Sequence, residues 1–147
     1  MTELRKKYLV KHGIRPSLQR MAIMDYLLDH HTHPTVDEIY TAISPRIPTL
    51  SRTTVYNTLK LFVSQGVALY ISIDDRNARF DGVIDKHAHF RCKDCGRIID
   101  IPLSGREELF TELQGMIVDY TSINIKGLCK LCAKQKRLSQ AQPILKY

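Results

Sequence analysis

The chain has 147 residues, a formal net charge of +7, 44% hydrophobic residues and 25% charged residues. This length can bury a real core and accommodates one or two compact modules. No segment approaches the roughly 20 apolar residues of a membrane span, and the N-terminus lacks an apolar signal region. We therefore expect a soluble, cytoplasmic protein with no membrane partner. The basic balance favours a polyanionic partner such as nucleic acid.

Four stretches have the periodicity of amphipathic helices. They cover residues 3–12, 17–30, 35–43 and 51–66. Thr35 and Glu38 stand at capping-box spacing at the start of the third stretch. Ser51 can cap the fourth, and Gly66 follows its last turn. The third and fourth helices are therefore well delimited by their end residues.

A two-stranded hairpin is predicted directly after the fourth helix. Residues 67–73 and 78–84 flank the turn sequence DDRN. Three helices followed by a hairpin make a winged helix-turn-helix. We therefore predict a winged-helix DNA-binding domain with its hinge over residues 1–85.

Beyond residue 85 the predicted elements become shorter. They are strands at residues 87–91, 97–101 and 120–127, a helix over 105–118, and a short basic helix from Cys129. The fold class is therefore α+β, in which residues 86–147 form a second, α/β domain.

All four cysteines belong to two C-x-x-C pairs, Cys92 with Cys95 and Cys129 with Cys132. The two-residue gap lets both sulfurs of a pair face one point about 2.3 Å away, and two pairs complete a tetrahedral cage that suits Zn²⁺. Disulfides, a redox-active C-x-x-C and unrelated buried cysteines are the alternatives. A cytosolic location and the occurrence of two complete pairs argue against them. Because four thiolates leave no open coordination position, we predict a structural zinc site.

A second group of ligands differs in chemistry from the cysteines. His87 and His89 alternate along a predicted strand, so both imidazoles point to one face. Asp81, Asp100 and His33 are the candidate partners. Three nitrogens and two oxygens are harder donors than thiolates and suit Fe²⁺ or Mn²⁺. A solvated H-x-H pair and an Asp100 that caps a turn are the alternatives.

Five motifs occur in a fixed order over residues 8–135: HPTVDEIY, SRTTVYNTL, ARFD, HAHFRCKDCGRIIDI and CKLC. In this combination the chain resembles the ferric uptake regulator (Fur) family of metal-dependent bacterial repressors. The resemblance implies a homodimer bound to an operator in double-stranded DNA, with residues 86–147 as the dimerisation and metal-binding domain and zinc in the cysteine pairs. It also implies a regulatory Fe²⁺ or Mn²⁺ site, whose positions are His33, Asp81, His87, His89 and Asp100.

The peroxide-sensing branch of the family, PerR, is the most similar. Asp81 and Asp100 stand where matching iron sensors usually have glutamates. The resemblance implies that site-bound Fe²⁺ reduces hydrogen peroxide and that the oxidant attacks His33 or His87, giving 2-oxo-histidine. The oxidised ring is a poorer ligand, so the metal leaves and repression ends. Mn²⁺ would support DNA binding without this reaction, and no enzymatic turnover is expected.

The fourth helix is the expected DNA reader. The candidate contacts are Arg15, Arg20, Arg52, Thr53, Thr54, Tyr56, Asn57 and Lys60. Tyr56 matches a base-contacting tyrosine of the family and can lie against a thymine methyl group, whereas Asn57 can read an adenine. Arg15 and Arg20 can contact the DNA backbone, with a solvated helix face as the alternative. Val55, Leu59 and Phe62 have the spacing of core residues.

Two other functions stay open at this point. The same site can report iron, manganese or zinc sufficiency, with metal dissociation as the switch. A centre of three histidines and two aspartates can also belong to an oxygenase or a hydrolase. Against an enzyme stand the winged-helix pattern, the lack of a substrate-positioning motif and a ligand set that leaves little room for substrate.

Overall fold

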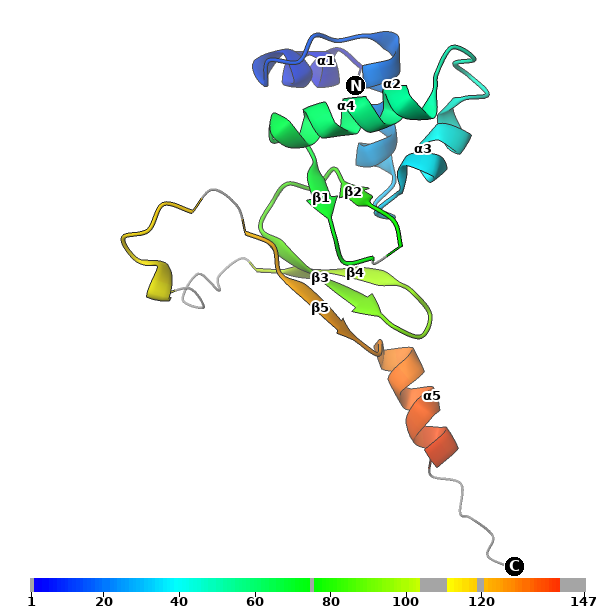
Figure 1. Cartoon of the computed structure of the whole chain (residues 1–147), viewed down its shortest axis with the longest axis vertical. Helices are drawn as coiled ribbons and strands as arrows, with labels where there is room; N and C mark the ends of the chain where they lie inside the picture. Colours follow the sequence, from blue (N-terminus) through cyan, green and yellow to red (C-terminus); the bar gives the residue numbers. More distant parts are fainter. Residues whose placement is uncertain (1, 75, 104–110, 119–120, 141–147) are drawn as a thin grey trace, which may run out of the picture. The chain divides into compact units, whose positions relative to one another are not determined.

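The structure of the chain is a computed structural model that describes residues 2–74, 76–103, 111–118 and 121–140. The chain forms two compact units, Met1–Asp85 and Lys86–Tyr147 (Figure 1). Within the described ranges, no helix is both long enough and apolar enough to cross a membrane.

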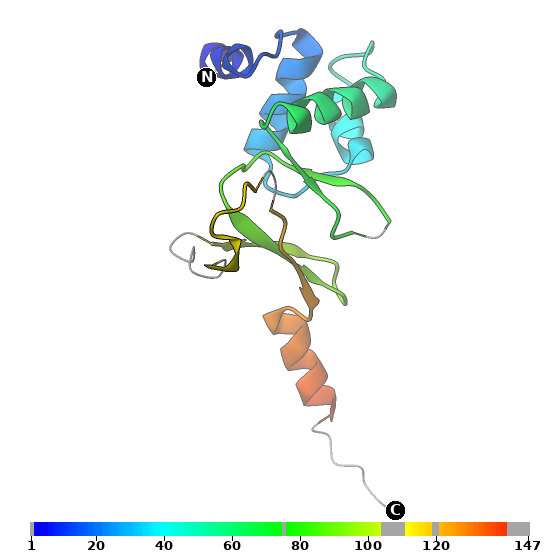
Figure 2. The same ribbon diagram turned by 60° about the vertical axis from the view of Figure 1, so that its left-hand side comes forward.

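The first unit is built from helices and one hairpin. Its elements are α1 (Thr2–Lys11), α2 (Leu18–Asp29), α3 (Val36–Ile43), α4 (Arg52–Ser64), β1 (Leu69–Ile71) and β2 (Arg79–Asp81). The two strands pair antiparallel, and α4 packs against both α2 and α3 (Figures 1 and 2). This is the predicted order of helices followed by a hairpin, and the α+β fold class is confirmed.

The helix ends follow from the capping residues in the sequence. Thr35 and Glu38 form a complete capping box at the start of α3, in which the Glu38 carboxylate accepts the Thr35 backbone N–H at 2.7 Å. The Ser51 side chain caps α4. Gly66 has a φ of +70° and ends α4, because glycine adopts this left-handed conformation without steric cost.

Apolar faces of the helices and hairpin meet in one core. Its buried members include Leu9, Ile23, Met24, Leu27, Ile39, Ile43, Val55, Leu59, Phe62 and Phe80. Val55, Leu59 and Phe62 of α4 are fully buried, as their spacing predicted. One face of α4 is therefore fixed in the core, and the other is left for contacts outside the unit.

The hairpin strands are shorter than predicted. Each has three residues, whereas the sequence pattern covers 67–73 and 78–84. The Asp74 side chain accepts the backbone N–H of Arg76 at 3.0 Å. Such a local side-chain bond is typical of turns, so Asp74 and Arg76 belong to the loop rather than to the strands.

The second unit contains a small sheet and one helix. Its elements are β3 (His87–Cys92), β4 (Ile98–Pro102), β5 (Asn124–Gly127) and α5 (Lys130–Gln140). The sheet order is β4-β3-β5, with β4 antiparallel and β5 parallel to the central strand β3. The buried cluster contains Cys92, Cys129 and Cys132, with Phe90, Ile99 and Leu128 packed around them.

The predicted helix over 105–118 is wrong in its described part. Residues 104–110 lie outside the described residues. Residues 111–113 form a single 3₁₀ turn, and Gly115 follows with a φ of +81°. A left-handed glycine ends a helix, so the apolar spacing of this stretch does not produce one.

One ion-pair network joins α1 to α2 and gives a pH prediction. Arg5 donates to Asp25 and Asp29, each at 2.6 Å, and holds the pKa of Asp29 below its usual 3.8. A carboxylate whose pKa is lowered by folding stabilises the folded state above the unfolded pKa, and this contribution disappears as the pH falls through the folded pKa.

We therefore expect Arg5→Gln to lower the thermal midpoint by about 1–4 °C at neutral pH and low salt, since exposed pairs contribute little each. The difference from the parent should shrink in acid and in high salt. Lys6→Gln, which removes the same charge from an exposed neighbour, is the matched control. A midpoint difference that persists below the pKa of Asp29 would contradict this electrostatic explanation.

Candidate metal centres

The four cysteines converge at the end of the second unit's sheet. Cys92 is the last residue of β3, Cys95 lies in the turn before β4, and Cys129 and Cys132 lie at the start of α5. Their four Sγ atoms lie within 4.8 Å of one another, and Cys95 Sγ is 3.9 Å from Cys129 Sγ. Sulfurs bound tetrahedrally at about 2.3 Å from one ion lie about 3.8 Å apart. The cluster therefore fits a metal cage.

Hydrogen bonds and burial shift the pKa values of Cys92 and Cys132 in opposite directions. The Cys129 backbone N–H donates to Cys92 Sγ at 3.3 Å and contributes most to lowering the pKa of Cys92, to about 6. A side-chain hydrogen bond with Cys129, together with burial, raises the pKa of Cys132 to about 12. Neighbouring thiolates repel one another, so full deprotonation of the group needs a bound cation.

A second ligand group lies on the other half of the same sheet. His87 and His89 share one face of β3, and Asp100 on β4 is the register partner of His89. The two Nε2 atoms are 2.9 Å apart, and Asp100 Oδ1 lies 3.6 Å from His87 Nε2 and 3.5 Å from His89 Nε2. Adjacent ligands about 2.1 Å from one ion lie about 3.0 Å apart in octahedral and about 3.4 Å apart in tetrahedral coordination. The spacing therefore fits three donors to one ion.

The first unit holds a buried pair of the same chemistry. His33 lies in the loop before α3, Asp81 is the last residue of β2, and their side chains are 4% and 3% exposed. His33 Nε2 and Asp81 Oδ2 are 3.6 Å apart. The other carboxylate oxygen, Oδ1, accepts the Val83 backbone N–H at 2.8 Å, which fixes the orientation of the group. Two further nitrogen and oxygen donors are thus held in place.

The exposed face of α4 carries the predicted DNA contacts of that helix. Arg52, Thr53, Tyr56, Asn57 and Lys60 are exposed, and Thr54 is half-buried. Arg15 is exposed just before α2, and Arg20 in its first turn donates to the Arg15 carbonyl at 2.8 Å. These positions are compatible with nucleic-acid contacts, which stay predictions.

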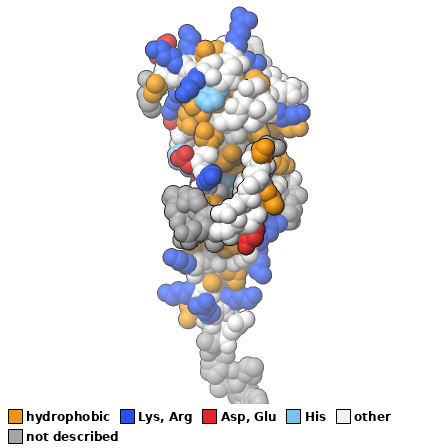
Figure 3. All heavy atoms as spheres, turned by 90° about the vertical axis from the view of Figure 1, so that its left-hand side faces the viewer, with side chains coloured by type: hydrophobic (Ala, Val, Ile, Leu, Met, Phe, Trp, Pro, Cys, Tyr) orange, Lys and Arg blue, Asp and Glu red, His pale blue; other side chains and the backbone are white. Residues whose placement is uncertain are grey.

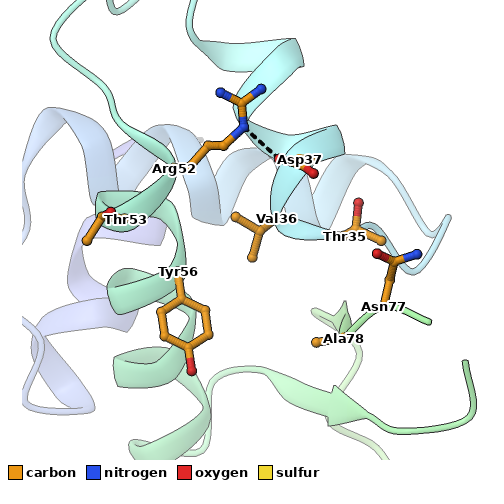
Figure 4. Close-up of a pocket in the computed structure, with 8 residues that line it drawn as sticks. All are labelled: Thr35, Val36, Asp37, Arg52, Thr53, Tyr56, Asn77 and Ala78. Carbon is orange, nitrogen blue, oxygen red and sulfur yellow. Dashed lines mark hydrogen bonds and ion pairs between the residues drawn. The ribbon is translucent and has the colours of Figure 1, made fainter. Parts of the chain in front are cut away.

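A hollow of about 390 Å³ lies beside this face, between α3, α4 and the hairpin loop (Figure 4). Arg52 stands at its edge and donates from Nε to Asp37 Oδ1 at 2.7 Å. The Arg52 guanidinium also lies 4.2 Å from the ring centroid of Tyr40. Asp37 and Tyr40 were not predicted to take part, because they lie on another helix and share no motif with Arg52.

Sequence comparison identifies the family. The sequence model of the ferric uptake regulator family matches residues 11–125. The chain belongs to the ferric uptake regulator family.

Individual members of this family are similar over most of their length. The peroxide-responsive repressor PerR of Staphylococcus epidermidis is 38% identical over 130 residues, which cover 86% of this chain and 87% of that protein. The solved structure of the Campylobacter jejuni peroxide stress regulator is 27% identical, covers 90% of this chain and 98% of its own, and gives a TM-score of 0.67. The Pseudomonas aeruginosa ferric uptake regulator with manganese, 22% identical, shares the fold with a TM-score of 0.71 and coverage of 85% and 97%.

The five predicted regulatory ligands of this Fur-family chain form two groups, one in each unit. The first group is His33 with Asp81, and the second is His87 with His89 and Asp100. Two residues were missed: Arg79, which donates to the His33 carbonyl, and Asp74, which accepts from Arg79. Arg79 stands two positions before Asp81 in ARFD, on the same side of the strand, and that alternation was the available signal.

Removal of the metal from the cysteine cluster gives a direct test of its structural role. We expect a strong chelator to release one Zn²⁺ per chain and to unfold the second unit, because metal binding counts as folding free energy in small metal domains. Amide exchange should accelerate in β3, β4 and α5, whereas α2 and α4, which have their own core, should keep their protection.

Restoring Zn²⁺ should restore the slow exchange, which serves as the control for irreversible damage. Cys95→Ser should retain less zinc than the parent protein. Unchanged protection of β3 after metal analysis has proved zinc loss would contradict a structural role.

Proposed function

We propose that the protein is a homodimeric, metal-dependent DNA-binding repressor that responds to hydrogen peroxide. Its 38–40% identity to peroxide-responsive repressors of two Staphylococcus species supports this assignment. The aspartates at positions 81 and 100, where iron sensors of the family usually carry glutamates, point the same way. We further propose that Zn²⁺ occupies the cysteine cluster and that Fe²⁺ or Mn²⁺ is the regulatory ion.

The observation that carries the proposal is the division of the nitrogen and oxygen ligands between the units. The unit with the helix-turn-helix elements supplies His33 and Asp81, and the sheet unit supplies His87, His89 and Asp100. We propose that all five bind one ion. Its binding would then favour a single orientation of the units, and in a dimer that orientation sets the distance between the two α4 helices. Half-sites on DNA lie about 34 Å apart, so only a matching distance permits binding to both.

Fe²⁺ held by these residues would activate hydrogen peroxide as an oxidant of nearby side chains, and the oxidised imidazole would supply the two electrons overall. His33 and His87 would bind the ion through their imidazole rings, which would place both rings next to it. Overall, one oxygen atom of peroxide enters the ring as a C=O group, the displaced hydrogen moves to nitrogen, and the other oxygen leaves as water. The modified ring is a weaker donor, so the two groups lose their common ion. The response consumes the protein, and we therefore propose no catalytic turnover.

Oxidation mapping tests this function. The dimer is loaded with Fe²⁺ or Mn²⁺ without oxygen and treated with a small excess of hydrogen peroxide. We expect a gain of one oxygen atom on peptides containing His33 or His87 in the Fe²⁺ form alone, with parallel loss of operator binding.

His12 and His30, whose Nδ1 atoms contact backbone carbonyls at helix ends, are internal controls and should stay unmodified. Unmodified His33 and His87 in both metal forms, with DNA binding that follows metal occupancy, would instead identify a metal-sufficiency repressor. Loss of sequence-specific DNA binding in every metal form would contradict both regulators.

The Arg52 contacts give a prediction for DNA recognition. Asp37 and Tyr40 hold the Arg52 guanidinium at the first turn of α4, and its two Nη groups point away from Asp37 (Figure 4). Two such donors suit the O6 and N7 acceptors of a guanine. Arg52→Ala should weaken operator binding by about 5- to 150-fold, which corresponds to about 1–3 kcal/mol, and relax preference at one base pair.

Arg46→Ala is the matched control, because Arg46 is exposed and lies beyond the end of α3. Side chains of Lys and Arg are spread along the face shown in Figure 3, so charge alone does not locate the DNA surface. An equal loss of affinity for the operator and for random DNA in the Arg52 variant would identify a phosphate contact instead.

A further inference from the structure

The backbone of His33 is held in an unfavourable conformation. Its φ is +53°, and His33 is the only non-glycine residue with a positive φ in the described part of the chain. This left-handed region crowds the Cβ atom of L residues and is disfavoured. The imidazole nevertheless lies buried beside Asp81. Surrounding contacts must therefore impose this conformation.

Arg79 of β2 makes those contacts. Its Nη1 donates to the His33 carbonyl oxygen at 3.0 Å, and its Nε donates to Asp74 Oδ2 at 2.9 Å. The Asp74 side chain is 5% exposed. The guanidinium is planar and has its donors in a fixed fork, so an anchored Nε determines where Nη1 lies. The His33 peptide is thus positioned by an arginine that is itself anchored by a buried carboxylate.

The loop that follows His33 lies along β2. The Phe80 backbone N–H donates to the Pro34 carbonyl at 3.0 Å, and Thr35 forms a bridge with Arg79. Thr35 is also the N-cap of α3, and Glu38 of the same capping box lies 3.6 Å from Arg79 Nη1. One side chain therefore connects His33, the hairpin and the first turn of α3.

We propose that Arg79 is the positioning residue of His33: it fixes the left-handed peptide that aims the imidazole at the regulatory ion. The inference rests on the proposed role of His33 as a ligand and extends it to a residue outside the ligand set. The same arrangement gives a route by which a change at His33 reaches α3 and the hairpin. Arg79 also compensates the buried Asp74 charge, so a test must separate positioning from stability.

The Arg79→Lys variant separates the positioning of His33 from the stability of the fold. A lysine can keep the ion pair with Asp74 but lacks the fork that reaches the carbonyl at the same time. The regulatory site of the zinc-loaded dimer is titrated with Mn²⁺ in competition with a chelating dye. Loss of a group that orients a metal ligand typically costs about 10- to 100-fold in metal affinity. We expect a loss of this size for Arg79→Lys, with a thermal midpoint close to that of the parent.

A double-mutant cycle with His33→Ala shows whether the effect passes through His33. The Arg79→Lys change should cost no further affinity once His33 is absent. Arg76→Lys, the same substitution at an exposed position in the loop before β2, is the control and should leave affinity unchanged. Equal losses in both backgrounds, an unchanged affinity of Arg79→Lys, or an unchanged affinity of His33→Ala would each overturn the inference.

A measurement without the regulatory ion adds an independent readout. In the zinc-loaded dimer without Mn²⁺, the Phe80 amide should exchange faster in Arg79→Lys than in the parent, because the His33 loop is released from β2. Unchanged exchange would overturn the inference. Asp74→Asn weakens the anchor of Arg79 and provides a second variant with the same expected results, should Arg79→Lys fold poorly.

Neither readout requires peroxide. Absence of histidine oxidation in the parent would therefore count against the proposed peroxide response alone, and the outcome for Arg79 would still be decided.

Discussion

In the part of the second unit that the structure describes, the cysteine cluster makes up most of the buried core. Its buried cluster contains three cysteines and is completed by half-buried Phe90, Ile99 and Leu128. Few apolar side chains are buried among these described residues, so burial offsets little of the conformational entropy of ordering the sheet, and a bound dication can supply what burial does not. Cys92 ends the central strand β3, so the position of that strand follows from the cluster. His87 and His89 lie on this strand, and their geometry therefore depends on the cysteines as well.

The cysteine cluster and the histidine and aspartate ligands differ in donor chemistry. This difference, rather than the shape of each site, determines which metals each prefers. Thiolates are soft donors that retain Zn²⁺ tightly, whereas imidazole and carboxylate groups exchange metals of intermediate hardness. One short strand carries both kinds of donor: His87 and His89 near its start and Cys92 at its end. If Zn²⁺ fills the cysteine cluster as proposed, that site can support an exchangeable one a few residues away, and metal loss at the second would leave the first intact.

Local chemistry explains what the sequence could predict. Some features depend only on residues a few positions apart, so they were identified without a structure. They are the C-x-x-C pairs, the H-x-H strand, the capping box at Thr35 and the glycine at position 66. Features that depend on contacts between distant parts of the sequence were not predicted. The left-handed peptide of His33 depends on Arg79, which lies 46 residues away in the sequence. The helix predicted over 105–118 failed because apolar spacing was given more weight than the backbone preference of Gly115.

The division of ligands between the units determines how strongly metal can control DNA binding. A ligand shifts a conformational equilibrium only by the difference between its affinities for the two states. If the sheet unit alone bound the ion fully, occupancy would leave the orientation of the helix-turn-helix elements unchanged. If all five residues bind one ion as proposed, the affinity contributed by His33 and Asp81 is the upper limit of the free energy that can orient the DNA-binding elements. Coupling free energies between two binding sites are typically about 1–3 kcal/mol. A positioning contact that changes metal affinity tenfold is therefore large enough to control how strongly metal binding affects DNA binding.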